Sequence, residues 1–210
     1  MKLLSLKDIQ EALDLGRPDC LERVIAAQEL GFVAFSKARV VVPEVFYMPF
    51  DDARPGGLHV KGARMQQGEV YVIKLAGGCS DNQVRYGVSA SQGLMIVGSA
   101  MTGQPLILLQ DEGYLTDLRT ALAGHIAAKY LAPREITGIG ILGSGGQARL
   151  QAHYLQSLTS CRSLYLWGRT PEHVQSCAED LEQDGFRVQI MSSPAEVAQH
   201  ANLIVTTTAA

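Results

Sequence analysis

The sequence predicts an α/β protein in which an α+β domain precedes a Rossmann-type, doubly wound parallel sheet whose second half is absent from the chain. Three observations predict this class. Short β-rich segments broken by glycines fill residues 39–109, strand-sized and helix-sized apolar patterns alternate after Pro133, and a glycine-rich turn, 143–148, joins the first of those strands to a helix. We place the domains at 1–132 and 133–210.

Composition narrows the classes of partner. The chain has 210 residues, of which 47% are hydrophobic, and a net charge of −3 without a basic run, which argues against nucleic acid or an anionic membrane as main partner. The apolar runs are too short to span a membrane, and charges at Lys7 and Asp8 interrupt any signal-peptide core, so we expect a cytoplasmic protein. The four cysteines form no C-x-x-C pair, so we predict neither a metal site nor a disulfide framework.

The N-terminal domain is expected to open with two helices. Ser5 and Asp8 have the spacing of a capping box, and Asp19 is suited to cap a second helix. Five antiparallel strands should follow, at 39–48, 58–65, 70–75, 94–101 and 105–109, with turns at 51–57, 66–68 and 101–103. Thr116 is expected to cap a helix from Asp117 to about Tyr130, which ends before Pro133.

The C-terminal domain alternates strands and helices. Strands are expected at 136–142, 164–167, 186–190 and 203–206, and helices at 147–158, 171–183 and 194–200. This order builds a parallel sheet from right-handed βα units. Because a Rossmann sheet normally has six strands, we expect a second half of about 60 residues or more beyond residue 210.

The glycine turn is suited to a dinucleotide. Gly143 permits a tight strand-to-helix turn, Gly145 and Gly146 let the backbone approach a pyrophosphate, and the small Ala148 lets the helix pack on the strand. The helix that starts near Gln147 adds free N–H groups and a partial positive charge. The alternative is an ordinary glycine-rich turn.

The end of the second strand selects the cofactor in such folds. An acidic residue there binds a ribose 2′-hydroxyl, whereas an arginine accommodates a 2′-phosphate. Here the strand is followed by Arg169 and Thr170 and no carboxylate, which favours NADPH over NADH. The alternative is a solvated arginine beside a helix that Thr170 and Pro171 begin. Thr206, with the next two threonines, ends the fourth strand and either lines the cofactor or simply continues the strand.

Two cations are candidates for binding a substrate carboxylate. Lys74 interrupts an otherwise apolar strand, and Arg119 lies in the first turn of a predicted helix, where the dipole disfavours a cation unless an anion joins it. A lysine in a partly buried site can also exchange a proton. The alternatives are an edge-strand lysine that reaches solvent and an arginine paired with a nearby carboxylate.

Three segments, 71–75, 111–121 and 139–148, together resemble the ornithine cyclodeaminase/μ-crystallin family, and Thr-Asp-x-Arg-Thr-Ala at 116–121 is the specific part. The resemblance implies that the N-terminal domain supplies a substrate pocket and the interface of a homodimer, and that NAD(P) binds the second domain. It implies the following roles: Lys74 and Arg119 hold the substrate's α-carboxylate and assist proton transfer, Ser89 lies near the nicotinamide carboxamide, and Gly145, Gly146 and Gln147 form the phosphate loop.

Two departures from the family pattern stand out. A second carboxylate-binding arginine, in Pro-x-Arg, is replaced at Pro43-Glu44-Val45, and Lys61 or Arg64 is a possible substitute. The family's catalytic aspartate belongs to the portion expected beyond residue 210, so this polypeptide alone is expected to be inactive.

The resemblance implies hydride transfer between a nicotinamide and the α-carbon of an amino or imino acid. A cyclodeaminase cyclises the imine and releases ammonia, an amino-acid dehydrogenase hydrolyses it, and a ketimine reductase of the pyrroline-carboxylate type runs in reverse. We expect the first, with net reduction as the close alternative. Two further alternatives are a crystallin-like NADPH-dependent binding protein without turnover and a truncated product without activity.

Overall fold

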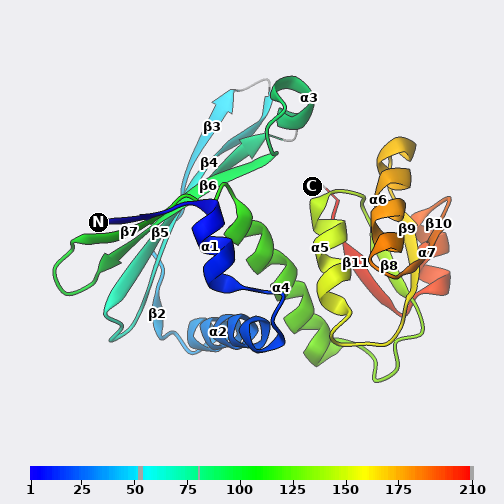
Figure 1. Cartoon of the computed structure of the whole chain (residues 1–210), viewed down its shortest axis with the longest axis horizontal. Coiled ribbons are helices and arrows are strands. Elements are labelled where there is room, and N and C mark those ends of the chain that lie inside the picture. Colours follow the sequence, from blue (N-terminus) through cyan, green and yellow to red (C-terminus); the bar gives the residue numbers. More distant parts are fainter. Residues whose placement is uncertain (52–53, 80, 209–210) are drawn as a thin grey trace. The chain divides into compact units, whose positions relative to one another are not determined.

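The computed structural model of the chain describes residues 1–51, 54–79 and 81–208. The chain divides into two compact units, Met1–Asp117 and Leu118–Ala210, which are described separately (Figure 1). This division falls inside helix α4 (Tyr114–Leu131), whereas we expected the domain boundary after residue 132, where the same helix ends. That domain boundary stays a prediction.

The first unit contains a mixed sheet of seven strands rather than five antiparallel ones. Its strands are β1 (Lys2–Leu4), β2 (Val40–Val41), β3 (Phe46–Asp51), β4 (Arg54–Met65), β5 (Val70–Cys79), β6 (Ser91–Ser99) and β7 (Pro105–Leu109). The order is β1-β7-β6-β5-β4-β2, with β3 also paired to β4, and β1 runs parallel to β7 while the other pairs are antiparallel.

The sequence prediction missed β1 because three residues are too few to show a period of two. The single strand expected at 39–48 is instead β2 and β3, separated at Pro43, which cannot donate a hydrogen bond to a strand ladder. The turn expected at 51–57 lies partly outside the described residues, at 52–53, and its remaining residues belong to β3 and β4.

The helices of the first unit are α1 (Leu6–Leu13), α2 (Pro18–Ser36) and α3 (Asn82–Tyr86). The capping box is confirmed, because the Asp8 N–H donates to Ser5 Oγ and the Ser5 N–H donates to the Asp8 carboxylate at 2.8 Å. Asp19 does not cap α2. The helix begins at Pro18 after Arg17, and the Asp19 carboxylate instead pairs with the Arg17 guanidinium at 2.8 Å.

The cap expected at Thr116 is also corrected. Helix α4 begins at Tyr114, three residues before the expected start at Asp117, and its first turn is capped by Asp111, whose carboxylate accepts the Leu115 N–H at 2.9 Å. Gly113, at φ +89°, allows the chain to turn between Asp111 and the helix. Arg119 therefore lies in the second turn of α4 and not in the first.

The second unit contains a parallel four-stranded sheet. Its elements are β8 (Ile139–Leu142), α5 (Gly146–Leu155), β9 (Ser163–Trp167), α6 (Pro171–Gln183), β10 (Arg187–Ile190), α7 (Pro194–His200) and β11 (Leu203–Thr206). The order β10-β9-β8-β11 is 3-2-1-4 along this unit, the order of a Rossmann sheet, so the predicted fold class is confirmed. The chain order reverses between β8 and β11.

The core of this unit lies between the central strands and the helices beside them. Ile139, Ile141, Leu164 and Leu166 project from β8 and β9 and are fully buried against residues of α5 and α6, which include Leu181. Burial alternates along β9, where Leu164 and Leu166 are buried and their neighbours are partly exposed. This core fixes the carboxyl ends of the strands relative to the two helices.

Gly143 makes the connection from β8 to α5 possible. Its φ of +121° is accessible to glycine and strained for other residues. A Cβ at this position would lie 2.5 Å from Thr207 Oγ1 and 2.9 Å from the Thr207 carbonyl carbon. The residue is therefore required both for its conformation and for its closeness to the backbone after β11.

We predict that Gly143→Ala lowers the free energy of unfolding of the second unit by about 2–4 kcal/mol, because backbone strain adds to a clash with backbone atoms. Gly145→Ala is the matched control. Gly145 has φ −86° and open space around the Cβ position, so its replacement should cost about 1 kcal/mol or less, through the weaker helix cap. Urea unfolding of both variants measures the two free energies of unfolding. Equal decreases would contradict the requirement for glycine at residue 143.

Candidate functional site

The glycine turn lies where three strand ends meet. The Gly143 N–H donates to the Trp167 carbonyl at the end of β9 at 2.7 Å, and the Thr207 N–H after β11 donates to the Leu142 carbonyl at the end of β8, also at 2.7 Å. A Cβ at Gly168 would lie 3.0 Å from Ser144 Oγ, so the segment after β9 also approaches the turn. This is the crevice at the carboxyl ends of the strands, beside the point where the strand order reverses, in which such sheets bind ligands.

Gly145 and Gly146 present unused backbone donors at this crevice. Within the described part of the chain, neither N–H has a hydrogen-bond partner, and an added Cβ on either residue would meet nothing within 4 Å. Gly146 begins α5, so both donors belong to a helix N-terminus. Free N–H groups at a helix N-terminus with open space beside them are an arrangement that binds anions in proteins.

The next two predicted residues differ in environment. Ala148 is fully buried and its N–H donates to the Gly145 carbonyl at 3.1 Å, which fits the small residue expected where the helix packs on the sheet. Gln147 lies in the first turn of α5, and its side-chain oxygen accepts a hydrogen bond from Gln151 Nε2 at 3.3 Å. The Gln147 side-chain amide is thus held along the first turns of α5.

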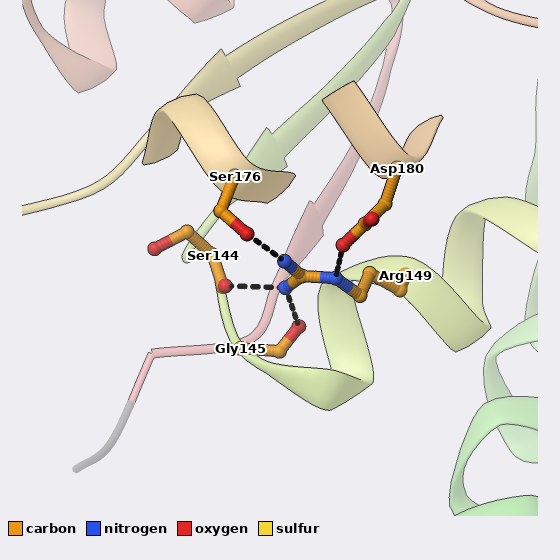
Figure 2. Close-up of polar contacts among 5 residues, drawn as sticks. All are labelled: Ser144, Gly145, Arg149, Ser176 and Asp180. Atoms are coloured by element: carbon orange, nitrogen blue, oxygen red, sulfur yellow. Dashed lines mark hydrogen bonds and ion pairs between the residues drawn. The ribbon is translucent and has the colours of Figure 1, made fainter. Parts of the chain in front are cut away.

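An arginine that our sequence interpretation missed lies behind the turn. Arg149, on α5, donates to the carbonyl oxygens of Ser144 at 2.8 Å and Gly145 at 3.3 Å, and it also reaches Ser176 and Asp180 on α6 (Figure 2). Asp180 is 31 residues away along the chain, and no local pattern links it to Arg149. Below this network the Cys177 thiol is fully buried; burial raises its pKa, so the thiol stays neutral.

Arg169 and Thr170 follow β9, at the strand end that selects the cofactor in such folds. Arg169 is exposed, and no hydrogen bond or ion pair joins it to another described residue. Thr170 is the N-cap residue of α6, but its hydroxyl makes no capping bond, and Pro171 occupies the first helical position. Thr170 and Pro171 therefore begin α6, as the alternative interpretation predicted. The Thr170 hydroxyl and the Arg169 guanidinium remain available to a ligand.

The threonines after β11 do not share one environment. Thr206 is exposed and faces a cavity lined by residues such as Gly124 and Gln151. Thr207 is the threonine that touches Gly143, and its hydroxyl donates to the Leu142 carbonyl at 3.2 Å. A role for Thr206 in cofactor binding stays a prediction.

In the first unit, Lys74 lies in the interior of the sheet. Strand β5 is flanked by β4 and β6, so the alternative of an edge-strand lysine is excluded. Its ammonium group donates to Thr116 Oγ1 in the first turn of α4 at 3.4 Å, in a half-buried position. Arg119 follows Thr116 by three residues, which places both on one face of α4.

The strand register distinguishes the two candidate substitutes for the missing arginine. Lys61 is directly opposite Lys74 on β4, so both side chains project from the same face of the sheet. Arg64 is opposite Tyr71 and projects from the other face. The register therefore selects Lys61.

Ser89 lies in the exposed segment before β6. Its hydroxyl accepts the Ser91 N–H at 3.3 Å and its carbonyl accepts a hydrogen bond from Asn82, so the serine is held in a local turn. Its contact with a nicotinamide stays a prediction. Lys74 and Ser89 belong to the first unit and the glycine turn to the second, and each group is described within its own unit.

The described residues contain no group of three or more His, Cys, Asp or Glu side chains that could hold a metal ion. Nor does any helix in 1–51, 54–79 or 81–208 have the length and apolarity needed to cross a membrane.

Comparison with known proteins places this geometry in a family. The model of the Ornithine cyclodeaminase/mu-crystallin family matches residues 6–210. The uncharacterized cyclodeaminase y4tK of Sinorhizobium fredii is 32% identical over 213 residues, which cover 100% of this chain and 62% of that protein. The chain thus spans about 60% of the length of this relative.

Two solved structures share the fold. A lysine cyclodeaminase, described with recognition of L-lysine, L-ornithine and L-2,4-diaminobutyric acid, is 26% identical with a TM-score of 0.86, covering 100% of this chain and 61% of that one. An archaeal alanine dehydrogenase dimer with bound NAD is 26% identical with a TM-score of 0.81, and the match covers 99% of this chain and 60% of that one. The chain belongs to the ornithine cyclodeaminase/mu-crystallin family.

Proposed function

We propose that this chain carries the substrate-binding and cofactor-binding elements of an NAD(P)-dependent, ornithine cyclodeaminase-like enzyme that transfers hydride at the α-carbon of an amino or imino acid. The observation that carries the proposal is the pair of unused N–H groups of Gly145 and Gly146 at the reversal point of the parallel sheet. Family membership and the NAD bound by the alanine dehydrogenase relative support it.

The residues around the turn fit a dinucleotide. Gly145 and Gly146 would donate to the pyrophosphate, and the open space at both positions admits it. Arg169 and Thr170 would hold a ribose 2′-phosphate through charge-assisted hydrogen bonds, so we favour NADPH over NADH. When bound, the nicotinamide supplies or accepts the hydride.

A carboxylate site in the first unit would bind the substrate. Lys61 and Lys74 are directly opposite one another and project from the same face of the sheet. Both cations would therefore be able to bind one substrate α-carboxylate, which would offset the repulsion between these like charges. The family pattern also assigns Arg119, which belongs to the second unit, to the substrate carboxylate, and Lys74 would also assist proton transfer.

Reduction of a cyclic ketimine is the second candidate. Cyclodeamination returns the hydride and needs no net reductant, whereas an enzyme with a 2′-phosphate site would draw on NADPH for net reduction. Arg169 beside a strand end without a carboxylate favours this alternative. A crystallin-like binding protein without turnover would show cofactor and carboxylate binding but no substrate-dependent oxidation or reduction of the cofactor.

We also propose a homodimer formed through the first unit. Strand β3 carries large exposed apolar side chains, at Phe46, Tyr47, Met48 and Phe50, and pairs with β4 alone. Exposed apolar surface of this kind marks interaction sites. The alanine dehydrogenase relative is a dimer, which supports a second copy as the partner. Cytoplasmic localisation stays a prediction.

We predict that Arg169→Ala weakens NADPH binding about tenfold, because a charge-assisted hydrogen bond to the 2′-phosphate is lost, and changes NADH binding less than about twofold. Titrations followed by nicotinamide fluorescence measure both affinities. Equal weakening of the two cofactors would contradict the 2′-phosphate site. The absence of binding of either cofactor to the unmodified chain would contradict the cofactor proposal itself.

We predict opposite effects of Lys61→Met on stability and on binding. Without ligand, removal of one like charge should leave the thermal midpoint unchanged or raise it, whereas the rise in midpoint produced by L-ornithine or pyrrole-2-carboxylate should shrink. Arg64→Met, on the other face, is the control and should preserve the ligand-dependent rise. An undiminished rise in Lys61→Met would exclude Lys61 from the carboxylate site.

A further inference from the structure

Arg149 uses its three guanidinium nitrogens on four partners (Figure 2). One terminal nitrogen donates to the carbonyl oxygens of Ser144 at 2.8 Å and Gly145 at 3.3 Å. Nε donates to the Asp180 carboxylate at 2.6 Å, and the other terminal nitrogen donates to Ser176 Oγ at 3.3 Å. The guanidinium thus joins the backbone of the turn to helix α6.

The two bonded carbonyls determine where two backbone donors point. A trans peptide is planar, with its C=O and its N–H directed to opposite sides. The Ser144 carbonyl shares a peptide with the Gly145 N–H, and the Gly145 carbonyl shares one with the Gly146 N–H. Because Arg149 binds both carbonyls, both N–H groups point away from the guanidinium, and these are the two donors without partners in the described residues.

We propose that Arg149 is a positioning residue of the dinucleotide turn: by holding the carbonyls of Ser144 and Gly145 it directs the N–H groups of Gly145 and Gly146 at the cofactor pyrophosphate. This inference rests on the proposed cofactor binding. The Ser144–Gly145 peptide needs such support most, because neither glycine carries a side chain that could hold the turn. The Gly145 carbonyl also accepts the Ala148 N–H at 3.1 Å, so the next peptide is held by both Arg149 and the first turn of α5.

The surroundings of Arg149 distinguish this role from two others. A direct phosphate ligand would have to leave its present partners, and the guanidinium lies on the carbonyl side of the two peptides, opposite the N–H groups. A role in stability alone is a poor explanation, because the Arg149 and Asp180 side chains are 30% and 50% exposed and ion pairs of that exposure contribute little. Asp180 also neutralises most of the positive charge, so orientation rather than added charge is the contribution.

Arg149→Lys tests the proposal, because an ammonium group retains the charge but cannot hold both carbonyls and Asp180 in a planar fork. Arg162→Lys is the matched control. Arg162 also donates one terminal nitrogen to two carbonyls, of Thr159 at 2.8 Å and Cys161 at 3.0 Å, but it lies before β9, at the amino end of the strand. If the replacement of any such arginine lowered order parameters or cofactor affinity, the decrease would therefore appear in both variants.

Two measurements are made on each variant of the full chain. Backbone amide order parameters of Gly145 and Gly146, measured by NMR without cofactor, should stay near the rigid value of about 0.85 in Arg162→Lys and fall below about 0.6 in Arg149→Lys. Calorimetric titration should show NADH binding weakened about tenfold in Arg149→Lys only. Adenosine, which lacks a pyrophosphate, should bind within about twofold of the unmodified chain in both variants.

Unchanged order parameters in Arg149→Lys would overturn the proposal, as would equal weakening of NADH and adenosine. If the unmodified chain bound no NADH, the cofactor proposal would fall, and the order parameters would still decide whether Arg149 orients the turn.

Discussion

The close approach of Gly143 to Thr207 is the constraint on which the rest of the second unit depends. At φ +121° the backbone leaves β8, donates to the end of β9 and lies against the residue after β11, so three strand ends meet at one residue that has no side chain. A larger residue would separate β8 from β11. The helix that follows, α5, owes its start and direction to the same residue, and with them the donors that face the crevice.

The order of the strands places the glycine turn at a position where parallel sheets bind ligands. Because the chain crosses from β10 back past β8 to β11, the strand order reverses beside the glycine turn, and such a reversal point is where doubly wound sheets bind ligands. The glycines supply space and donors there, Arg149 holds the peptides from behind, and Arg169 stands at the neighbouring strand end. In the first unit, the antiparallel register of β4 and β5 places Lys61 opposite Lys74, the two cations of the proposed carboxylate site.

The sequence predicted an element best where the spacing of apolar residues agreed with a residue that begins or ends a helix or strand. Helices α6 and α7 and strand β11 have the predicted bounds, because Pro171 and Pro194 begin the helices and clear apolar runs define the strand. Short elements such as β1 were missed, and the cap of α4 was placed at Thr116 because nothing in the sequence distinguishes it from Asp111, whose carboxylate reaches the helix across a turn with positive φ values. The glycine turn could be predicted because its residues are contiguous. Pairings between distant residues, such as Arg149 with Asp180, are produced by tertiary packing and leave no local pattern.

The central claim is that the peptides at the start of α5 bind a pyrophosphate. The most direct test is the change in backbone amide chemical shifts of the isotopically labelled chain as NADPH is added. We expect the largest shifts on residues 143–147 and on Arg169, and we expect adenosine alone to reproduce only the shift at Arg169. Saturable shifts confined to other parts of the chain, or no saturable shifts at all, would contradict it.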